Sequence, residues 1–223
     1  MTQIHTTLPL APPAASLILH DYRRCPFCIR TRIVLHLKGI AYQRVEEPIR
    51  QWTHWMRTHV NSPRVPVLRA IDSNHDDLWH MPESNAINEY LDKHFGAPLF
   101  TPADSTTYQT MTQWWQWCDT ELKPHIDHYK YGENRQYQAS KVKYHAQKLG
   151  EVLQVLESAL EKQTHLIDNT LTLADIAIIP FIRQIQRTRN GEFSFSSYPR
   201  ILTWSNQLLA TDWFNDRVMK KVT

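Results

Sequence analysis

The sequence predicts an α/β unit followed by an all-helical domain, and two observations predict this fold class. In the first part, short apolar runs that suit buried strands alternate with segments of helical spacing. From Tyr108 onward, apolar residues instead recur every three or four positions, as on the core side of a helical bundle. The composition agrees with a folded chain, since 42% of the 223 residues are hydrophobic and 21% are charged.

The first unit is predicted to have the element order βαβαββα. Strands are expected at residues 17–19, 41–45, 65–68 and 77–80, and helices at 26–38, 50–59 and 84–95. Pro26 suits the first turn of its helix, because its missing N–H has no intrahelical partner there. Gly39 suits the position just after that helix ends.

The domain limits follow from these elements. Residues 1–16 are expected to form a flexible Pro/Ala-rich tail; they lack the basic start and apolar stretch of a signal peptide. The α/β unit then covers residues 17–95, a linker with Pro98 and Pro102 covers 96–105, and the helical domain covers 106–223. Thr172 and Asp175 form a capping box before a wholly apolar run, which predicts a buried central helix. Shorter helices are expected near 198–209 and 212–220.

Charge and cysteine content restrict the partners and the location. A net charge of +3 without a basic run argues against nucleic acid or a membrane surface as a partner. No run approaches the roughly 20 apolar residues that span a bilayer. The chain has only three cysteines, which suits a reducing compartment, so we predict a cytoplasmic protein whose cysteine pair is chemical rather than structural.

The pair Cys25 and Cys28, in the motif Cys-Pro-Phe-Cys between a strand and a helix, is the candidate catalytic centre. The positive end of the helix dipole and the nearby Arg23 and Arg24 should lower the pKa of Cys25 and favour its nucleophilic thiolate. Cys28, one turn along, could attack a mixed disulfide at Cys25. A zinc site would need more ligands than the sequence offers, and two inert buried cysteines are a further alternative. Cys118 lies on an apolar helical stripe and is interpreted as a core residue.

Several separated motifs resemble one superfamily. The segment from Tyr22 to Arg32 resembles the active-site segment of glutaredoxins and of omega-type glutathione transferases. Val65-Pro66 resembles the cis-proline turn of the thioredoxin superfamily, and Pro82-Glu83-Ser84 resembles its acidic-Ser signature. The Thr172 box and the apolar helix after it resemble the C-terminal domain of glutathione transferases. The resemblance implies a thioredoxin-like first domain and a possible homodimer.

The resemblance also implies glutathione as co-substrate, with no metal. It implies that Val65, before a cis Pro66, presents its backbone to the cysteinyl part of glutathione. Glu83 would accept from the α-ammonium of the γ-glutamyl group, and Ser84, as a helix N-cap, would bind its carboxylate. Arg64 is one candidate for the glycyl carboxylate, because the lysine common in the family has no clear counterpart. Arg50 is the other candidate.

Three functions remain open at this stage. The leading one is a glutathione-dependent thiol–disulfide oxidoreductase that uses Cys25 on a small-molecule or protein disulfide. The presence of Cys28, where omega-type enzymes carry an apolar residue, favours it. The second is a glutathione transferase that conjugates or reductively deglutathionylates a small electrophile held against aromatic residues of the helical domain, with Trp114, Trp115, Trp117 and Tyr129 as candidates. The third is a non-catalytic glutathione-binding module.

Overall fold

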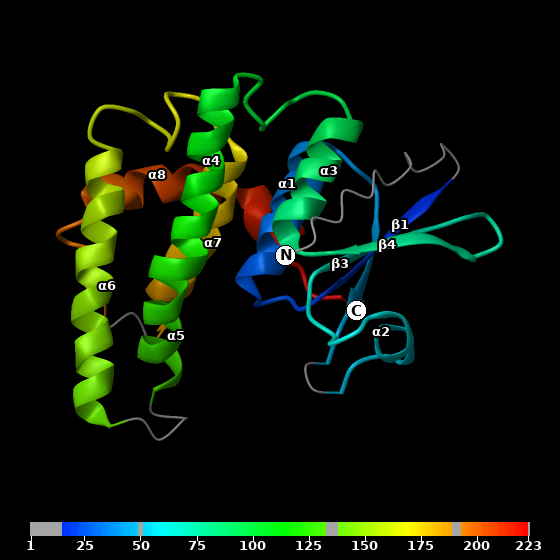
Figure 1. Cartoon of the computed structure of the whole chain (residues 1–223), viewed down its shortest axis with the longest axis horizontal. Coiled ribbons are helices and arrows are strands. Elements are labelled where there is room, and N and C mark those ends of the chain that lie inside the picture. The colour runs from blue at the N-terminus through cyan, green and yellow to red at the C-terminus, as the bar shows by residue number, and fades with distance from the viewer. Residues whose placement is uncertain (1–14, 49–50, 133–137, 189–192, 223) are drawn as a thin grey trace. The chain divides into compact units, whose positions relative to one another are not determined.

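The computed structural model describes residues 15–48, 51–132, 138–188 and 193–222. The chain forms two compact units, one up to Ala97 and the other from Pro98 to Lys220. The first is an α/β unit and the second is helical (Figure 1). The predicted fold class is therefore confirmed.

The first unit contains a four-stranded sheet in the order β2-β1-β3-β4. Strand β1 pairs parallel with β2 and antiparallel with β3, and β3 pairs antiparallel with β4. Along the chain the elements are β1 (Ser16–Asp21), α1 (Pro26–Leu37), β2 (Gln43–Glu46), α2 (His54–His59), β3 (Val67–Ile71), β4 (Asp77–Pro82) and α3 (Ser84–His94).

The core of the first unit lies between the sheet and the helices α1 and α3, which pack against each other (Figure 1). Every residue of β1 after Ser16 is buried, so both faces of this central strand are covered. Helix α1 begins at Pro26, as the sequence predicts, and ends at Leu37, after which Gly39 adopts a φ of +63°. Glycine is favoured at that position because it has no Cβ to clash in the left-handed region.

The second unit is built from helices and π-helical turns. They are α4 (Ser105–Trp117), η1 (Cys118–Leu122), α5 (Lys123–Tyr131), α6 (Ala139–Ala159), α7 (Leu173–Gln186), α8 (Pro199–Leu209) and η3 (Phe214–Val218). The predicted capping box is present at the start of α7. The Asp175 carboxylate accepts hydrogen bonds from the N–H and O–H of Thr172, from the N–H of Leu166 and from Trp204 Nε1–H. Helix α7, which is buried along most of its length, is thereby fixed to two neighbouring segments.

Several predicted boundaries were wrong by a few residues, and side-chain caps explain two of them. Helix α2 begins at His54 rather than at residue 50, because Thr53 is its N-cap and accepts from the N–H of Met56. Helix α4 begins at Ser105, the last residue of the predicted linker, because Asp104 caps it by accepting from the N–H of Thr107. Strand β4 runs on to Pro82, two residues beyond its predicted end.

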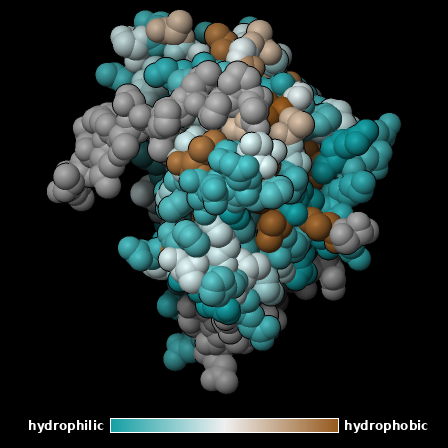
Figure 2. Space-filling view, turned by 90° about the vertical axis from the view of Figure 1, so that its right-hand side faces the viewer, coloured by the Kyte–Doolittle hydropathy of each residue, from teal (hydrophilic) through white to brown (hydrophobic). Residues whose placement is uncertain are grey.

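The face shown in Figure 2 is mostly hydrophilic, and its apolar side chains appear as separate spots. The large exposed hydrophobic residues are accordingly scattered along the sequence, at Leu78, Leu99, Tyr144, Val155 and Val222. Isolated residues of this kind are normal on a protein surface and do not mark a docking site. Among the described residues, no helix is both long and apolar enough to cross a membrane.

Candidate active site

The strand register brings most of the predicted site residues to one edge of the sheet. His20 near the end of β1 pairs with Val67 at the start of β3, and Val67 pairs with Pro82 at the end of β4. The loop to Cys25 leaves this edge, the turn at Val65 enters it, and the segment to Ser84 leaves it. Residues that are far apart in the sequence thus meet around three adjacent strand ends.

Cys25 occupies the N-cap position of α1 and is partly exposed. Its pKa is lowered from an ordinary value near 9 to about 7, chiefly because the Cys28 thiol hydrogen bonds to its sulfur. The N–H groups of Cys28 and Phe27 and the charge of Arg32 act in the same direction, whereas burial opposes them. The sulfur completes no capping hydrogen bond of ordinary geometry, so the amides act as dipoles at a helix end. At neutral pH, Cys25 is therefore substantially a thiolate.

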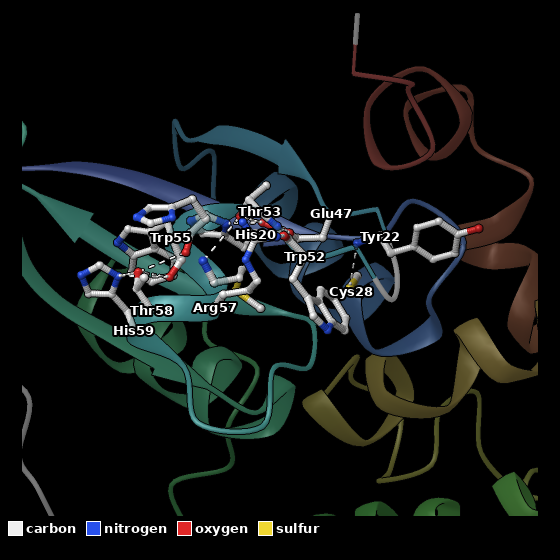
Figure 3. Close-up of polar contacts among 12 residues, drawn as sticks. His20, Tyr22, Cys28, Glu47, Trp52, Thr53, Trp55, Arg57, Thr58 and His59 are labelled. Carbon is white, nitrogen blue, oxygen red and sulfur yellow. Dashed lines mark hydrogen bonds and ion pairs between the residues drawn. The ribbon is translucent and has the colours of Figure 1, made fainter.

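Cys28 differs from Cys25 in both exposure and acidity. It is fully buried, and its sulfur accepts the backbone N–H of Tyr22 at 3.3 Å (Figure 3). Burial raises its pKa well above the ordinary value, and the neighbouring Cys25 and Asp21 raise it further. The shared proton therefore stays on Cys28 while Cys25 carries the negative charge. Both cysteines are free thiols in this structure.

The expectation that Arg23 and Arg24 supply the positive charge needs correction. The Arg24 side chain is exposed and donates to the phenolic oxygen of Tyr22 at 2.7 Å. Arg23 contributes through its backbone, whose N–H donates to Glu46 Oε1 at 2.9 Å. The arginine whose charge lowers the pKa of Cys25 is Arg32, seven positions further along α1 and fully buried.

The peptide bond between Val65 and Pro66 is cis, as the family resemblance implies. Pro66 is buried, while Val65 is partly exposed at the sheet edge that Cys25 also borders. The main-chain groups of Val65 therefore lie where an extended peptide could pair with them. This geometry agrees with the predicted role of Val65, which stays a prediction.

The segment at Glu83 and Ser84 follows β4 directly, but its cap differs from the expected one. Glu83, not Ser84, holds the N-cap position, and Ser84 is the first residue of α3. Glu83 is exposed with a φ of +73°, a conformation that L side chains rarely adopt. Such strain costs on the order of 1–3 kcal/mol and is found mainly at functional sites. The unpaired N–H groups of the first turn of α3 remain suited to a carboxylate.

Ser84 is itself held from within the unit. Its side chain is buried, and Arg30 Nη1 lies 3.4 Å from its hydroxyl oxygen and 3.3 Å from Asn85 Oδ1. Arg30 is fully buried, with its guanidinium 4.8 Å from the centre of the Phe27 ring. Helix α1 is thereby connected to the start of α3, so the cysteine and the predicted γ-glutamyl segment are positioned by one helix.

A buried carboxylate on the same edge was not anticipated from the sequence. Glu47 follows β2 and accepts hydrogen bonds from His20 Nδ1–H at 2.7 Å and from the N–H and O–H of Thr53 (Figure 3). His20 also stacks on Trp55 at 4.4 Å. These contacts fix α2 to the central strand. The only sequence signal was Thr53 itself, a residue type that favours N-caps.

Of the two arginine candidates for the glycyl carboxylate, the structure describes Arg64. Arg64 is exposed and precedes Val65, so it lies close to the site in sequence. Arg50 lies outside the described residues. Within those residues, no three His, Cys, Asp or Glu side chains are grouped as ligands for a metal ion.

The aromatic residues of the second unit divide into two groups. Trp115 and Tyr129 are buried, and Trp115 Nε1–H donates to the carbonyl of Leu173 at 3.1 Å, so both belong to the core of that unit. Trp114 and Trp117 are partly exposed and meet edge to face at 5.2 Å. Only these two remain candidates for contact with a substrate. Cys118 is buried in the same core, as the helical stripe predicts.

Comparison with known protein families identifies two successive matches. The family described as glutathione S-transferase, N-terminal domain, matches residues 19–99, and the family described as glutathione S-transferase, C-terminal domain, matches residues 118–212. The first match contains both cysteines, the cis proline and the Glu83 segment. The second contains the capping box and the buried helix α7.

Individual relatives resemble different parts of the chain. Glutathione S-transferase U28 of Arabidopsis thaliana is 22% identical over 196 residues, covering 86% of this chain and 84% of that protein. Glutaredoxin 2 of Escherichia coli is 33% identical over 90 residues, covering 37% of this chain and 36% of that protein. The solved structure of Ure2p in complex with glutathione has a TM-score of 0.78 at 21% identity, covering 93% of this chain and 95% of that chain. The last comparison supports the fold alone.

Proposed function

The chain belongs to the glutathione S-transferase superfamily, and on that premise we propose that it is a glutathione-dependent thiol–disulfide oxidoreductase with Cys25 as nucleophile. The observation that carries the proposal is the unequal cysteine pair: Cys25 is partly exposed at the start of α1, whereas Cys28 is fully buried and its sulfur accepts the N–H of Tyr22, and the pKa of Cys25 is lowered while that of Cys28 is raised. Attack on a disulfide requires a thiolate that is both ionised and accessible. Cys25 meets both conditions and Cys28 meets neither.

The reaction begins when the Cys25 thiolate attacks the glutathionyl sulfur of a mixed disulfide. The substrate disulfide breaks, Cys25 becomes bonded to glutathione, and the substrate leaves as a thiolate that takes up a proton. The thiolate of a second glutathione then attacks the glutathionyl sulfur, which releases oxidised glutathione and restores the Cys25 thiolate. The proton lost by that second glutathione balances the one taken up by the substrate.

Cys28 offers a second way to resolve the mixed disulfide. Once Cys25 is bonded to glutathione it carries no charge, so one of the influences that raise the pKa of Cys28 disappears. Cys28 can then lose its proton and attack the Cys25 sulfur, which releases glutathione and closes an internal disulfide. Two further glutathione molecules reduce that disulfide in turn.

Glutathione itself is proposed to lie along the sheet edge. Its cysteinyl part would pair with the backbone of Val65, beside the cis Pro66. Its γ-glutamyl group would contact Glu83 and the N–H groups at the start of α3, next to Ser84. Arg64 and Arg50 are the proposed partners for the glycyl carboxylate. This orientation directs the glutathione sulfur toward Cys25.

A transferase acting on a small electrophile is the second candidate function. The observation that favours it is the similarity to a plant glutathione S-transferase over 86% of the chain, whereas the similarity to glutaredoxin 2 covers 37% of it. Trp114 and Trp117 are the proposed contacts for such a substrate.

The test compares turnover of the mixed disulfide between glutathione and 2-mercaptoethanol with conjugation of a chloronitroarene. Wild type, Cys25→Ser and Cys28→Ser are assayed, and Cys118→Ala serves as a control because its sulfur is buried in the other unit. We expect disulfide turnover to disappear in Cys25→Ser and to survive in Cys118→Ala. Turnover that persists in Cys25→Ser would refute the oxidoreductase. Conjugation without disulfide turnover would establish the transferase, and glutathione binding with neither activity would indicate a binding module.

A further inference from the structure

The loop that carries Cys25 from β1 to α1 has nearly all of its backbone polar groups engaged. Cys25 N–H donates to the carbonyl of Tyr22 at 2.9 Å, and Tyr22 N–H donates to the Cys28 sulfur. Arg23 N–H donates to Glu46, and the Arg23 carbonyl accepts from Arg32 Nη2 at 2.6 Å. The position of the nucleophile therefore depends on a few side chains outside the loop, and Arg32 is one of them.

Arg32 connects the end of β1 to the middle of this loop. Its Nη1 donates to Asp21 Oδ2 at 2.8 Å, at the end of β1, while its Nη2 binds the Arg23 carbonyl two residues before Cys25. Arg32 and Asp21 are both fully buried. A planar guanidinium can make these two contacts at once in fixed directions, which the single ammonium of a lysine cannot.

The arrangement is not the one that stability alone would favour. Arg32 Nε is buried without a hydrogen-bond partner among the described residues. A buried ion pair also stabilises a fold no more than well-packed apolar residues commonly would, because removing two charges from water is costly. Retaining a buried charge with an unsatisfied N–H, in contact with the loop that carries a reactive thiol, therefore points to a role at that thiol.

We propose that Arg32 is the positioning residue of the nucleophile: its guanidinium, oriented by Asp21, holds the Cys25 loop at the Arg23 carbonyl and brings a fixed positive charge to that loop. The inference rests on the proposed function, in which Cys25 is the attacking group. The charges of the ion pair also act on the two thiols in opposite directions, since Arg32 lowers the pKa of Cys25 and Asp21 raises that of Cys28. One buried ion pair thus reinforces the difference between the cysteines.

Arg44 provides a matched control for this role. It approaches Asp21 from β2, with Nε at 3.2 Å from Oδ2 and Nη2 at 3.1 Å from Oδ1. It also pairs with Glu46. Replacing Arg44 therefore takes one guanidinium from Asp21, as replacing Arg32 does, but leaves the Arg32 contact with the Arg23 carbonyl in place. Because Arg44 remains, the Asp21 carboxylate keeps a partner in the Arg32 variants.

The test measures how fast iodoacetamide alkylates Cys25 as a function of pH, by mass spectrometry of the intact full-length chain. Wild type should show an inflection at about pH 7. In Arg32→Gln we expect the inflection at least about 0.5 unit higher, with alkylation at pH 6 slower by about three-fold or more, because the variant loses both the charge that lowers the pKa of Cys25 and the contact that holds its loop. Arg32→Lys, which keeps the charge without the forked contact, should fall between the two. Arg44→Gln should stay within about 0.3 unit of wild type.

Two results would overturn the proposal. One is an Arg32→Gln inflection equal to that of wild type. The other is an equal shift in Arg32→Gln and Arg44→Gln, which would mean that the effect runs through Asp21 or through general loosening. If circular dichroism shows that Arg32→Gln does not fold, the alkylation inflections of Arg32→Lys and Arg44→Lys are compared instead and decide the same question.

The alkylation assay contains no glutathione, so it is independent of the proposed function. If the wild-type protein shows no disulfide turnover, but the pH inflection of Cys25 alkylation is shifted in Arg32→Gln, the oxidoreductase function is refuted and the role of Arg32 is supported. Conversely, if disulfide turnover depends on Cys25 but the alkylation inflection is the same in wild type and Arg32→Gln, only the role of Arg32 is refuted.

Discussion

Replacing Cys28 by alanine should make Cys25 a much weaker acid, because the hydrogen bond from the Cys28 thiol is the largest single cause of its lowered pKa. A thiol with a pKa of about 7 is half ionised at pH 7, whereas one with the ordinary value near 9 is about 1% ionised. If the whole shift depended on Cys28, the thiolate fraction of Cys25 at pH 7 would fall by about 50-fold. The amides and Arg32 remain in the variant but are opposed by burial, so we expect a loss of that order.

Cys28→Ser is the matched variant, since a hydroxyl can still donate to the Cys25 sulfur. We expect its titration midpoint to lie between those of wild type and Cys28→Ala. The absorbance of the thiolate in the ultraviolet, followed as a function of pH, gives the midpoints directly. A Cys28→Ala midpoint that remains near pH 7 would refute the reasoning, because it would assign the acidity of Cys25 to the helix end and Arg32 alone.

Three further predictions concern other parts of the chain. Glu83→Gly should raise the free energy of unfolding by about 1 kcal/mol, because glycine adopts a positive φ without strain. The same variant should bind glutathione more weakly in calorimetry. A Glu83→Gly protein less stable than wild type would contradict the stability prediction. Burial lowers the pKa of His125 and His145 in the folded chain below the ordinary value of 6.5. As the pH falls below that value, the unfolded chain takes up protons at these histidines before the folded chain does, so the free energy of unfolding should decrease. Urea midpoints at pH 7 and 5.5 should show a smaller loss in the double variant His125→Gln/His145→Gln, and an equal loss would count against the idea. Asp175→Ala removes the acceptor of four hydrogen bonds and should cost at least about 3 kcal/mol in urea unfolding, while a cost below about 1 kcal/mol would show that the box is dispensable.

Much of the fold could be predicted because its signals are local. The apolar run at Leu17, the proline that opens α1 and the capping box at Thr172 each act within a few residues, and the structure contains all three features. Boundaries that depend on distant side chains could not be predicted in the same way. The start of α2, for example, follows from Thr53, whose backbone is held by the buried Glu47.

The candidate site was predictable at Cys25 and less so around it. Cys25 and the turn at Val65 could be identified from motifs, but Arg32 could not, because two helical turns separate it in sequence from the sulfur that it influences. Arg24 is adjacent to Cys25 in sequence and yet contacts Tyr22 instead. The positive φ of Glu83 could not be predicted either, since glutamate is not a residue type that favours it.

His20, Val67 and Pro82 occupy paired positions on three adjacent strands, which implies that the candidate site is assembled only when the chain folds. Each of the three site segments is positioned only when its own strand has paired with the next, and the acidity of Cys25 additionally needs the first turn of α1. A chain emerging from synthesis would therefore carry an ordinary, slowly reacting thiol. It would become a strong nucleophile only when α1 has formed and brought Cys28, the Phe27 amide and Arg32 to its sulfur, which makes the thiol titration a measure of correct folding at this site.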